Sequence, residues 1–308
     1  METTIYCPDI ECDSCVKIIT NSLEKTEGVS KFSISNDHVD VEYDPAKLDR
    51  ELIVDLIKEK GFRAGFEPFL RKTFWERWRD FRENKEKYSL EYKILNFSAS
   101  TFGLLLGIGF VVYWGLFNSS AEILPKYGWW FFYSALSVVA IGSAMWHFQS
   151  YRGTITSMTG MMIGMTFGMQ TGFLIGTILG ATNGMFVGSL AGMLSGVLVG
   201  WYNGKCCGIM GAMEGMMAGI MAGLMGAMTG VMLLVDHIFL FMPVFMILNL
   251  LVLIGLSYLL FEEMVEGNNT IEKQPAEFLT FFLFCFLALS ILMAIMIFAP
   301  KSGITGLA

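Results

Sequence analysis

Seven long apolar runs occupy most of the chain after residue 93 and constrain its fold more than any other feature. Each run reaches about 20 residues, the length that a helix needs to cross the hydrocarbon core of a bilayer. The sequence therefore predicts an all-α bundle of transmembrane helices. Because residues 181–184 alone separate the third run from the fourth, we expect six or seven spans. The runs lie at 94–117, 128–149, 157–180, 183–202, 208–234, 237–260 and 278–299.

The charged residues are concentrated before the first apolar run. Residues 1–67 contain 8 Lys and Arg and 15 Asp and Glu, residues 68–93 contain 8 and 5, and residues 94–308 contain 5 and 8. This distribution predicts a soluble head (1–67), a basic aromatic linker (68–93) and a membrane domain (94–300). The net charge of -7 leaves no basic surplus for phosphates, which argues against a protein that binds nucleic acid.

The linker mixes basic and aromatic residues and contains no glycine. We interpret it as a helix that lies on the cytoplasmic membrane face, or alternatively packs against the head. Its Lys and Arg residues precede the first span, which places the N-terminus in the cytoplasm by the positive-inside rule. Residues 1–10 lack the basic start and apolar run of a signal peptide. We therefore expect a multi-pass protein of the cell membrane with a cytoplasmic head.

The head alternates strand-like and helix-like patterns in the order βαββαβ. Alternation of apolar and polar residues predicts the strands, and near-helical spacing of apolar residues predicts the helices. This order within about 65 residues is the split βαβ, or ferredoxin-like, arrangement of an α+β fold. The predicted strands are 3–7, 29–35, 38–43 and 62–66, and the predicted helices are 16–28 and 48–61.

Cys12 and Cys15 lie between the first predicted strand and the first predicted helix. Two thiols at this spacing can bind one metal ion, and a helix N-terminus favours the thiolate form that binds metal. The alternatives are a redox dithiol, which would need a different topology, and two structural cysteines. We expect Cys7 to be a strand residue rather than a third ligand, and His38 to be a solvated residue at a strand start.

The head resembles the heavy-metal-associated domain, the copper-chaperone fold also found at the front of metal-pumping ATPases. That family carries G-M-x-C-x-x-C after its first strand and G-[FY] after its second helix. Here residues 9–15 read D-I-E-C-D-S-C, and residues 61–62 read G-F. The resemblance covers about residues 3–67 and implies that the two cysteines hold Cu(I). Ile10 can fill the apolar role of the family's methionine, whereas the carboxylate of Glu11 would suit Zn(II), Cd(II) or Pb(II).

Glycine occupies every fourth position from Gly160 to Gly208 and recurs at 211, 215, 219, 223, 226 and 230. A four-residue step drifts about 40° around a helix per repeat, so several helices must share this run. Each row of glycines lets a neighbouring helix approach closely. We expect the three helices within 157–234 to form a tight bundle, or to pack against copies of the chain in a homo-oligomer.

Methionine accompanies the glycines, and residues 158–232 hold 15 of the chain's 22. Thioethers are soft, neutral ligands that select Cu(I), so two facing rows of methionine would line a path for this ion. The alternative is that methionine fills space beside the glycines as a flexible apolar side chain. The two rows are Met161, Met165 and Met169, and Met213, Met217 and Met221.

Cys206 and Cys207 lie beside a lysine between the fourth and fifth spans. Thiols near a cation and a helix start can ionise, so this pair could receive metal from the head. The alternative is two cysteines at the membrane interface. Glu214 lies about two turns further along, and an acid at that depth is a candidate ion-path residue or counter-charge.

These features predict a membrane protein for transport or delivery of Cu(I), whose head passes metal to the cysteine pair and the methionines. The membrane domain is also similar to bacterial Gly- and Met-rich membrane proteins seen beside copper-binding modules. The rival hypotheses are a zinc or cadmium exporter and a membrane-anchored metallochaperone or sensor. The latter would dock with another metallochaperone or metal pump without transport. We expect no enzyme, because the sequence contains no nucleotide loop, ATPase phosphorylation motif or Ser/His/Asp arrangement.

Overall fold

The computed structural model describes residues 1–8, 10, 13–26, 28–35, 37–45, 47–60, 62, 64–68, 79, 88–117, 123–152, 157–261, 272–273 and 277–303. The chain divides into two compact units, which we describe separately. The first contains Met1–Lys85, and the second contains most of the chain from Glu86 onward.

A small antiparallel sheet forms the centre of the first unit. Its strands are β1 (Glu2–Tyr6), β2 (Val29–Ile34) and β3 (His38–Tyr43), in the spatial order β1-β3-β2. Gly65 extends the sheet beyond β1, since its backbone N–H and C=O both bond to Tyr6, at 3.1 and 2.8 Å. The predicted last strand is therefore reduced to one bridge among the described residues of its segment.

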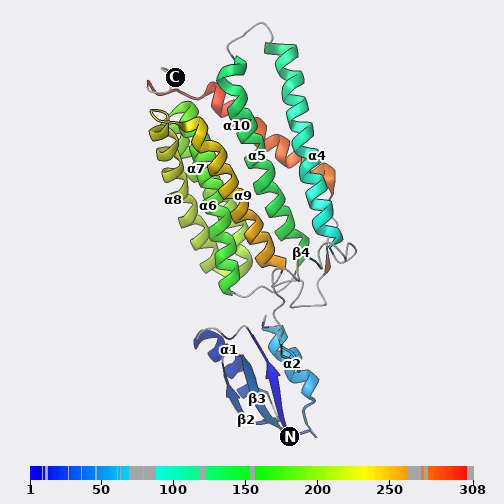
Figure 1. The fold of residues 1–308 in the computed structure, drawn as a ribbon. Coiled ribbons are helices and arrows are strands. Elements are labelled where there is room, and N and C mark those ends of the chain that lie inside the picture. The colour runs from blue at the N-terminus through cyan, green and yellow to red at the C-terminus, as the bar shows by residue number, and fades with distance from the viewer. Residues whose placement is uncertain are drawn as a thin grey trace. The chain divides into compact units, whose positions relative to one another are not determined.

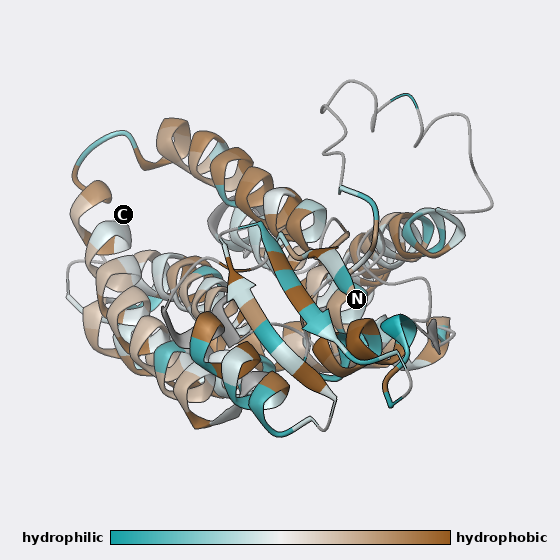
Figure 2. Cartoon of the chain, turned by 90° about the horizontal axis from the view of Figure 1, so that it is seen from below, coloured by the Kyte–Doolittle hydropathy of each residue, from teal (hydrophilic) through white to brown (hydrophobic). Residues whose placement is uncertain are grey.

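Two helices complete the head, α1 (Asp13–Glu24) and α2 (Arg50–Glu59). The strands alternate apolar and polar residues, as the brown and teal steps in Figure 2 show, so one face of the sheet is apolar. Helix residues cover this face and share one hydrophobic core with it. The predicted α+β ferredoxin-like head is confirmed. Its fully buried side chains include Ile5, Ile19, Leu23, Val39, Val41, Ile53 and Ile57.

Seven helices of the described chain are long and apolar enough to cross a membrane, which confirms the predicted all-α bundle (Figure 1). The protein is therefore a multi-pass membrane protein. One turn of π-helix, Tyr113–Phe117, extends the first of these helices. The helices are α4 (Ser89–Val112), α5 (Ile123–Ser150), α6 (Ser157–Asn183), α7 (Met185–Gly204), α8 (Gly208–Leu233), α9 (Ile238–Phe261) and α10 (Phe278–Phe298).

A one-residue turn at Gly184 separates α6 from α7. This region therefore contains two candidate spans rather than one. Gly184 has φ of +107°, a conformation that glycine adopts without steric cost. The turn is also held from outside the hairpin. The Asn183 side-chain amide donates to the carbonyl oxygens of Met296 and Ala299, and Asn183 accepts a 2.9 Å hydrogen bond from the Ser302 N–H.

Helices α6, α7 and α8 pack backbone to backbone through their glycines. A methyl group added at Gly200 would lie 2.3 Å from the carbonyl oxygen of Gly215, and one added at Gly168 would lie 2.4 Å from the same oxygen. Such distances leave no room for a side chain, so the glycine rows meet within one chain rather than between copies. The successive layers are Gly164, Gly204 and Gly211; Gly168, Gly200 and Gly215; Gly172, Gly196 and Gly219; and Gly176, Gly192 and Gly223.

The other helices pack through large side chains instead. Trp146 of α5 meets Phe281 of α10 edge-on, with ring centroids 5.7 Å apart. Nearby, Gly142 of α5 lies against the thiol of the buried Cys285. At the end where α4 begins, Tyr88 stacks on Phe261 at the end of α9, with centroids 4.9 Å apart. Close packing of glycine backbone against backbone therefore distinguishes α6, α7 and α8 from the other described helices.

We expect Gly215→Ala to destabilise the membrane domain by about 1–3 kcal/mol, because the new methyl group would overlap backbone atoms of α7. The control is Gly103→Ala on α4, where no atom lies within 4 Å of the added carbon. Thermal unfolding of the purified full chain in detergent measures both variants. Equal stability of the two variants would contradict the close packing.

Candidate metal centre

The predicted metal-binding loop joins β1 to α1. Cys15 is the third residue of α1, so its backbone lies in the first turn of that helix. Glu11 and Cys12 lie outside the described residues, as does the side chain of Cys15. The positive end of the helix dipole favours a thiolate at this position, which is the form that binds metal.

Ile10 of this segment is part of the hydrophobic core of the head. Its side chain is 2% exposed, as expected for the apolar role predicted at this position. Cys7 follows β1 directly and is completely buried in the same core. Its backbone N–H donates a 2.8 Å hydrogen bond to the carbonyl oxygen of Asp37. This placement agrees with the expectation that Cys7 is a structural residue of the strand end.

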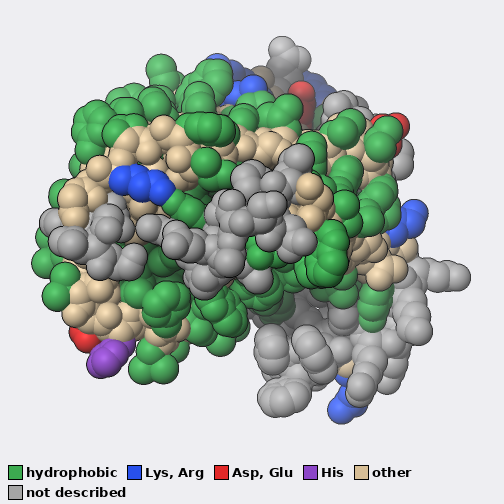
Figure 3. Space-filling model, turned by 90° about the horizontal axis from the view of Figure 1, so that it is seen from above, with side chains coloured by type: hydrophobic (Ala, Val, Ile, Leu, Met, Phe, Trp, Pro, Cys, Tyr) green, Lys and Arg blue, Asp and Glu red, His purple; other side chains and the backbone are tan. Residues whose placement is uncertain are grey.

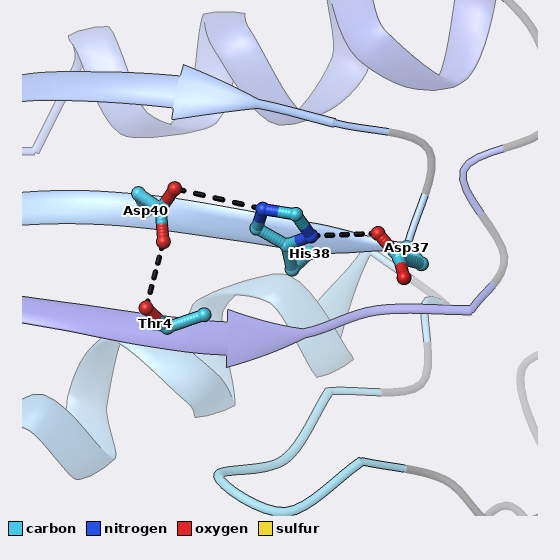
Figure 4. Close-up of polar contacts among 4 residues, drawn as sticks. All are labelled: Thr4, Asp37, His38 and Asp40. Carbon is cyan, nitrogen blue, oxygen red and sulfur yellow. Dashed lines mark hydrogen bonds and ion pairs between the residues drawn. The ribbon is translucent and has the colours of Figure 1, made fainter.

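His38 is held by two carboxylates on the open face of the sheet (Figure 4). Its Nδ1 lies 2.6 Å from Asp37 Oδ1, and its Nε2 lies 3.6 Å from Asp40 Oδ2. The Thr4 hydroxyl of β1 donates a 2.7 Å hydrogen bond to Asp40. His38 is therefore more constrained than a solvated strand-start residue. The i, i+2 spacing of His38 and Asp40 on a strand was the signal that could have indicated this pairing.

Comparison with known families identifies the head. Residues 4–63 match the family model of the heavy-metal-associated domain. The head is a heavy-metal-associated domain. The match indicates that the head binds heavy metal ions; along the sequence Cys12 directly precedes α1, and Cys15 belongs to its first turn. Neither the curated proteins nor the solved structures provided a match to the chain.

The second cysteine pair lies in a single 3₁₀ turn, Lys205–Cys207, between α7 and α8. Cys206 is exposed, and the side chain of Cys207 is outside the described set. Lys205 directs its ammonium group over the rings of Tyr202 and Trp201, at 4.4 and 5.5 Å from the centroids. The pair thus directly precedes α8, as expected. The nearby cation, the ammonium group of Lys205, also interacts with aromatic rings.

The predicted row of methionines on α8 lies on the outer surface of the bundle. Met213, Met217 and Met221 are 52%, 59% and 58% exposed. Glu214 is exposed on the same helix. Each of these methionines lies two positions after a glycine of the packed row, about 200° around the helix. Seen from above, hydrophobic side chains cover much of the described surface (Figure 3).

The two predicted rows of methionine do not face each other within one chain, which corrects that part of the sequence interpretation. On α6, Met161 and Met169 are half-buried and Met165 is 41% exposed. The surface that α6 and α8 share is made by glycine backbone, for example where Gly168 approaches Gly215. Because backbone atoms fill this interface, no methionine path runs between the two helices.

Carboxylates, histidines and cysteines do not gather into any further group of three that could hold a metal ion in the described part of the chain. The candidate metal ligands are therefore the cysteines of the head, the pair Cys206 and Cys207, and the exposed methionines of α8. Sequence reasoning overlooked one polar cluster, Glu91, His147 and Tyr151, whose members come from separate elements.

We expect the double variant Cys12→Ser, Cys15→Ser to lose the metal ion bound by the head, because serine hydroxyls do not replace soft thiolates. Cys7→Ala is the matched control and should retain the ion, since Cys7 is part of the core. Metal content of the purified full chain, measured after dialysis against a competing chelator, tests both. Retention of the ion by the double variant would refute the assignment.

Proposed function

We propose that this protein transports or delivers Cu(I) at the cell membrane, with its heavy-metal-associated domain in the cytoplasm. The observation that supports this function is the combination of a heavy-metal-binding head with an exposed thioether face on a spanning helix. In this proposal Cys12 and Cys15 capture the ion, and Cys206 and Cys207 receive it. The role is one of binding and transfer, without catalysis.

The chemistry of the donors favours Cu(I). Cysteine thiolates and methionine thioethers are soft ligands, which select Cu(I) over ions that prefer oxygen. The methionines of α8 follow one another at about one turn, so an ion could move between neighbouring weak sites. Glu214 on the same helix would supply a counter-charge for the cation.

The position of the methionines indicates where such a route would lie. Glycine backbone fills the interface between α6, α7 and α8, so the route runs along the outer surface of α8. Glu214 is exposed there, and an unpaired carboxylate facing lipid is costly. We therefore infer that a second copy of the chain covers this face and completes the route with its own methionines.

A second candidate function is a membrane-anchored metallochaperone or sensor that moves no metal across the bilayer. The closed glycine packing of α6, α7 and α8 favours it, since a single chain offers no passage between these helices. Such a protein would pass the ion from its head to another metallochaperone or to a metal pump. Its methionines would then serve as lipid-facing and packing residues.

Zinc or cadmium export is a further alternative, motivated by the carboxylate of Glu11 beside Cys12. Both residues lie outside the described set, so the argument rests on their chemistry alone. If zinc is the cargo, Glu11→Ala should weaken Zn(II) binding much more than Cu(I) binding. Competition titrations of the full chain against chelators of each ion measure this difference.

We expect liposomes carrying the protein to take up Cu(I), and the triple variant Met213→Leu, Met217→Leu, Met221→Leu to lose most of this flux. Leucine keeps the size and hydrophobicity of methionine but offers no sulfur ligand. The matched control replaces three buried methionines of α9 and α10, Met242, Met246 and Met296, by leucine. This control should retain the flux.

The outcomes separate the candidate functions. Loss of flux in the α8 variant alone supports a thioether route on the outer face of that helix. Equal flux in the parent and both variants would refute the route. Absence of flux from the parent, together with transfer of the ion from its head to a soluble acceptor, would instead support the anchored metallochaperone.

A further inference from the structure

A buried polar cluster lies at the end of the membrane domain where α4 begins and α5 ends. Glu91 is in the first turn of α4, His147 is in the last turn of α5, and Tyr151 follows in the short strand β4 (Tyr151–Arg152). His147 is 5% exposed and Tyr151 is 4% exposed. Polar groups buried to this extent normally require hydrogen-bond partners.

Glu91 is the centre of the cluster. The Tyr151 hydroxyl donates a short hydrogen bond to Glu91 Oε1, and His147 Nε2 lies 3.9 Å from the same oxygen. The rings of His147 and Tyr151 meet edge-on, with centroids 5.3 Å apart. Burial, the hydrogen bond to Glu91 and the charge of Glu91 together raise the pKa of Tyr151 above its usual range. Tyr151 therefore remains a protonated donor, and Glu91 is the acceptor.

Three buried atoms of this cluster have no hydrogen-bond partner among the described residues. They are Oε2 of Glu91 and both ring nitrogens of His147. Leaving a buried donor or acceptor unsatisfied costs about 1–3 kcal/mol per group. An Nε2–H of His147 that donates to Oε1 would satisfy one of these atoms, and a protonated His147 beside an ionised Glu91 would add the attraction of opposite charges. A shift of about 1 Å would bring Nε2 into hydrogen-bond range of Oε1.

We propose that Glu91 and His147 form a proton-binding site in the membrane domain, with Tyr151 as the group that positions Glu91. In the uptake step, the lone pair of a ring nitrogen of His147 bonds a proton from the aqueous phase. The resulting imidazolium pairs with the Glu91 carboxylate. Release returns the same proton to water and leaves the imidazole neutral.

The surroundings of the site contain few other described ionisable groups. Lys93 on α4 and Glu277 before α10 are both exposed. Arg152 of β4 and Glu272 and Lys273 of β5 (Glu272–Lys273) lie on the adjoining strands, and their side chains are outside the described set. Among the described side chains, Glu91 and His147 are the acid and the base of this site.

The site connects several helices of the membrane domain. Glu91 follows Tyr88, which stacks on Phe261 of α9, and Tyr151 pairs with Lys273 in the β4–β5 ladder before α10. Uptake of a proton would draw α4 and α5 together at this end. Resting on the proposed function, we further infer that uptake of a proton by this pair accompanies metal movement in the same membrane domain.

The direct test is ¹⁵N nuclear magnetic resonance of the full chain in nanodiscs, labelled at histidine. His147→Gln assigns the signal, since only two other histidines, His38 and His237, are present. As the pH of the sample is lowered, we expect the signal of an imidazolium to appear at His147. Glu91→Gln should abolish this signal, because a buried imidazolium needs its counter-charge.

A control variant keeps this test independent of folding damage. Glu277→Gln removes an exposed carboxylate and should leave the His147 signal unchanged. A His147 signal that stays neutral throughout the pH range, or that protonates equally in Glu91→Gln, would overturn the proposal.

A separate experiment tests whether protonation of the pair is coupled to metal movement. Liposomes with a trapped pH indicator should show a pH change that depends on added Cu(I), and Glu91→Gln should lose it while Glu277→Gln keeps it. Copper flux without this pH change would refute coupling and leave transport intact. Protonation of His147 in a protein without copper flux would support the proton site and contradict transport.

Discussion

The membrane domain depends on the close approach of backbones in α6, α7 and α8. Lipid tails are as apolar as leucine, so helices in a bilayer associate through packing rather than through the hydrophobic effect. Glycine allows this packing because it removes the side chain that would hold the helices apart. At the layer formed by Gly168, Gly200 and Gly215, a single added carbon would come within 2.3–2.4 Å of a carbonyl oxygen. The one-residue turn at Gly184 joins two of these closely packed helices, α6 and α7.

This packing also decides where side-chain chemistry can occur. Since the inner surfaces of the three helices are backbone, every large side chain of α8 must project outward. Met213, Met217 and Met221 therefore form an exposed face together with Glu214. The heavy-metal-associated head supplies thiolates, and this face supplies thioethers, which are two classes of soft ligand in one chain. In the proposed function, the metal route therefore lies on the outer surface of α8 rather than in the interior of the bundle.

Proton chemistry belongs to a different part of the membrane domain. Glu91, His147 and Tyr151 lie at the start of α4 and the end of α5, where helices pack through large side chains. The contacts between glycines of α6, α7 and α8 are instead made by backbone atoms. The proposed proton site, on α4 and α5, is thus distinct from the proposed metal route on α8.

The sequence by itself determined the βαββαβ order, the membrane spans and the Cys12–Cys15 motif, because periods of 2 and 3.6 residues and a short motif are local properties. The segment 62–66 was the exception, since among its described residues Gly65 alone pairs with the sheet. Only the tertiary structure decided that the glycine rows meet within one chain and that the methionines face outward. It also brought together His38, Asp40 and Thr4, and paired Glu91 with His147. Periodicity shows which residues share a face, whereas the neighbour that this face meets depends on contacts between distant segments.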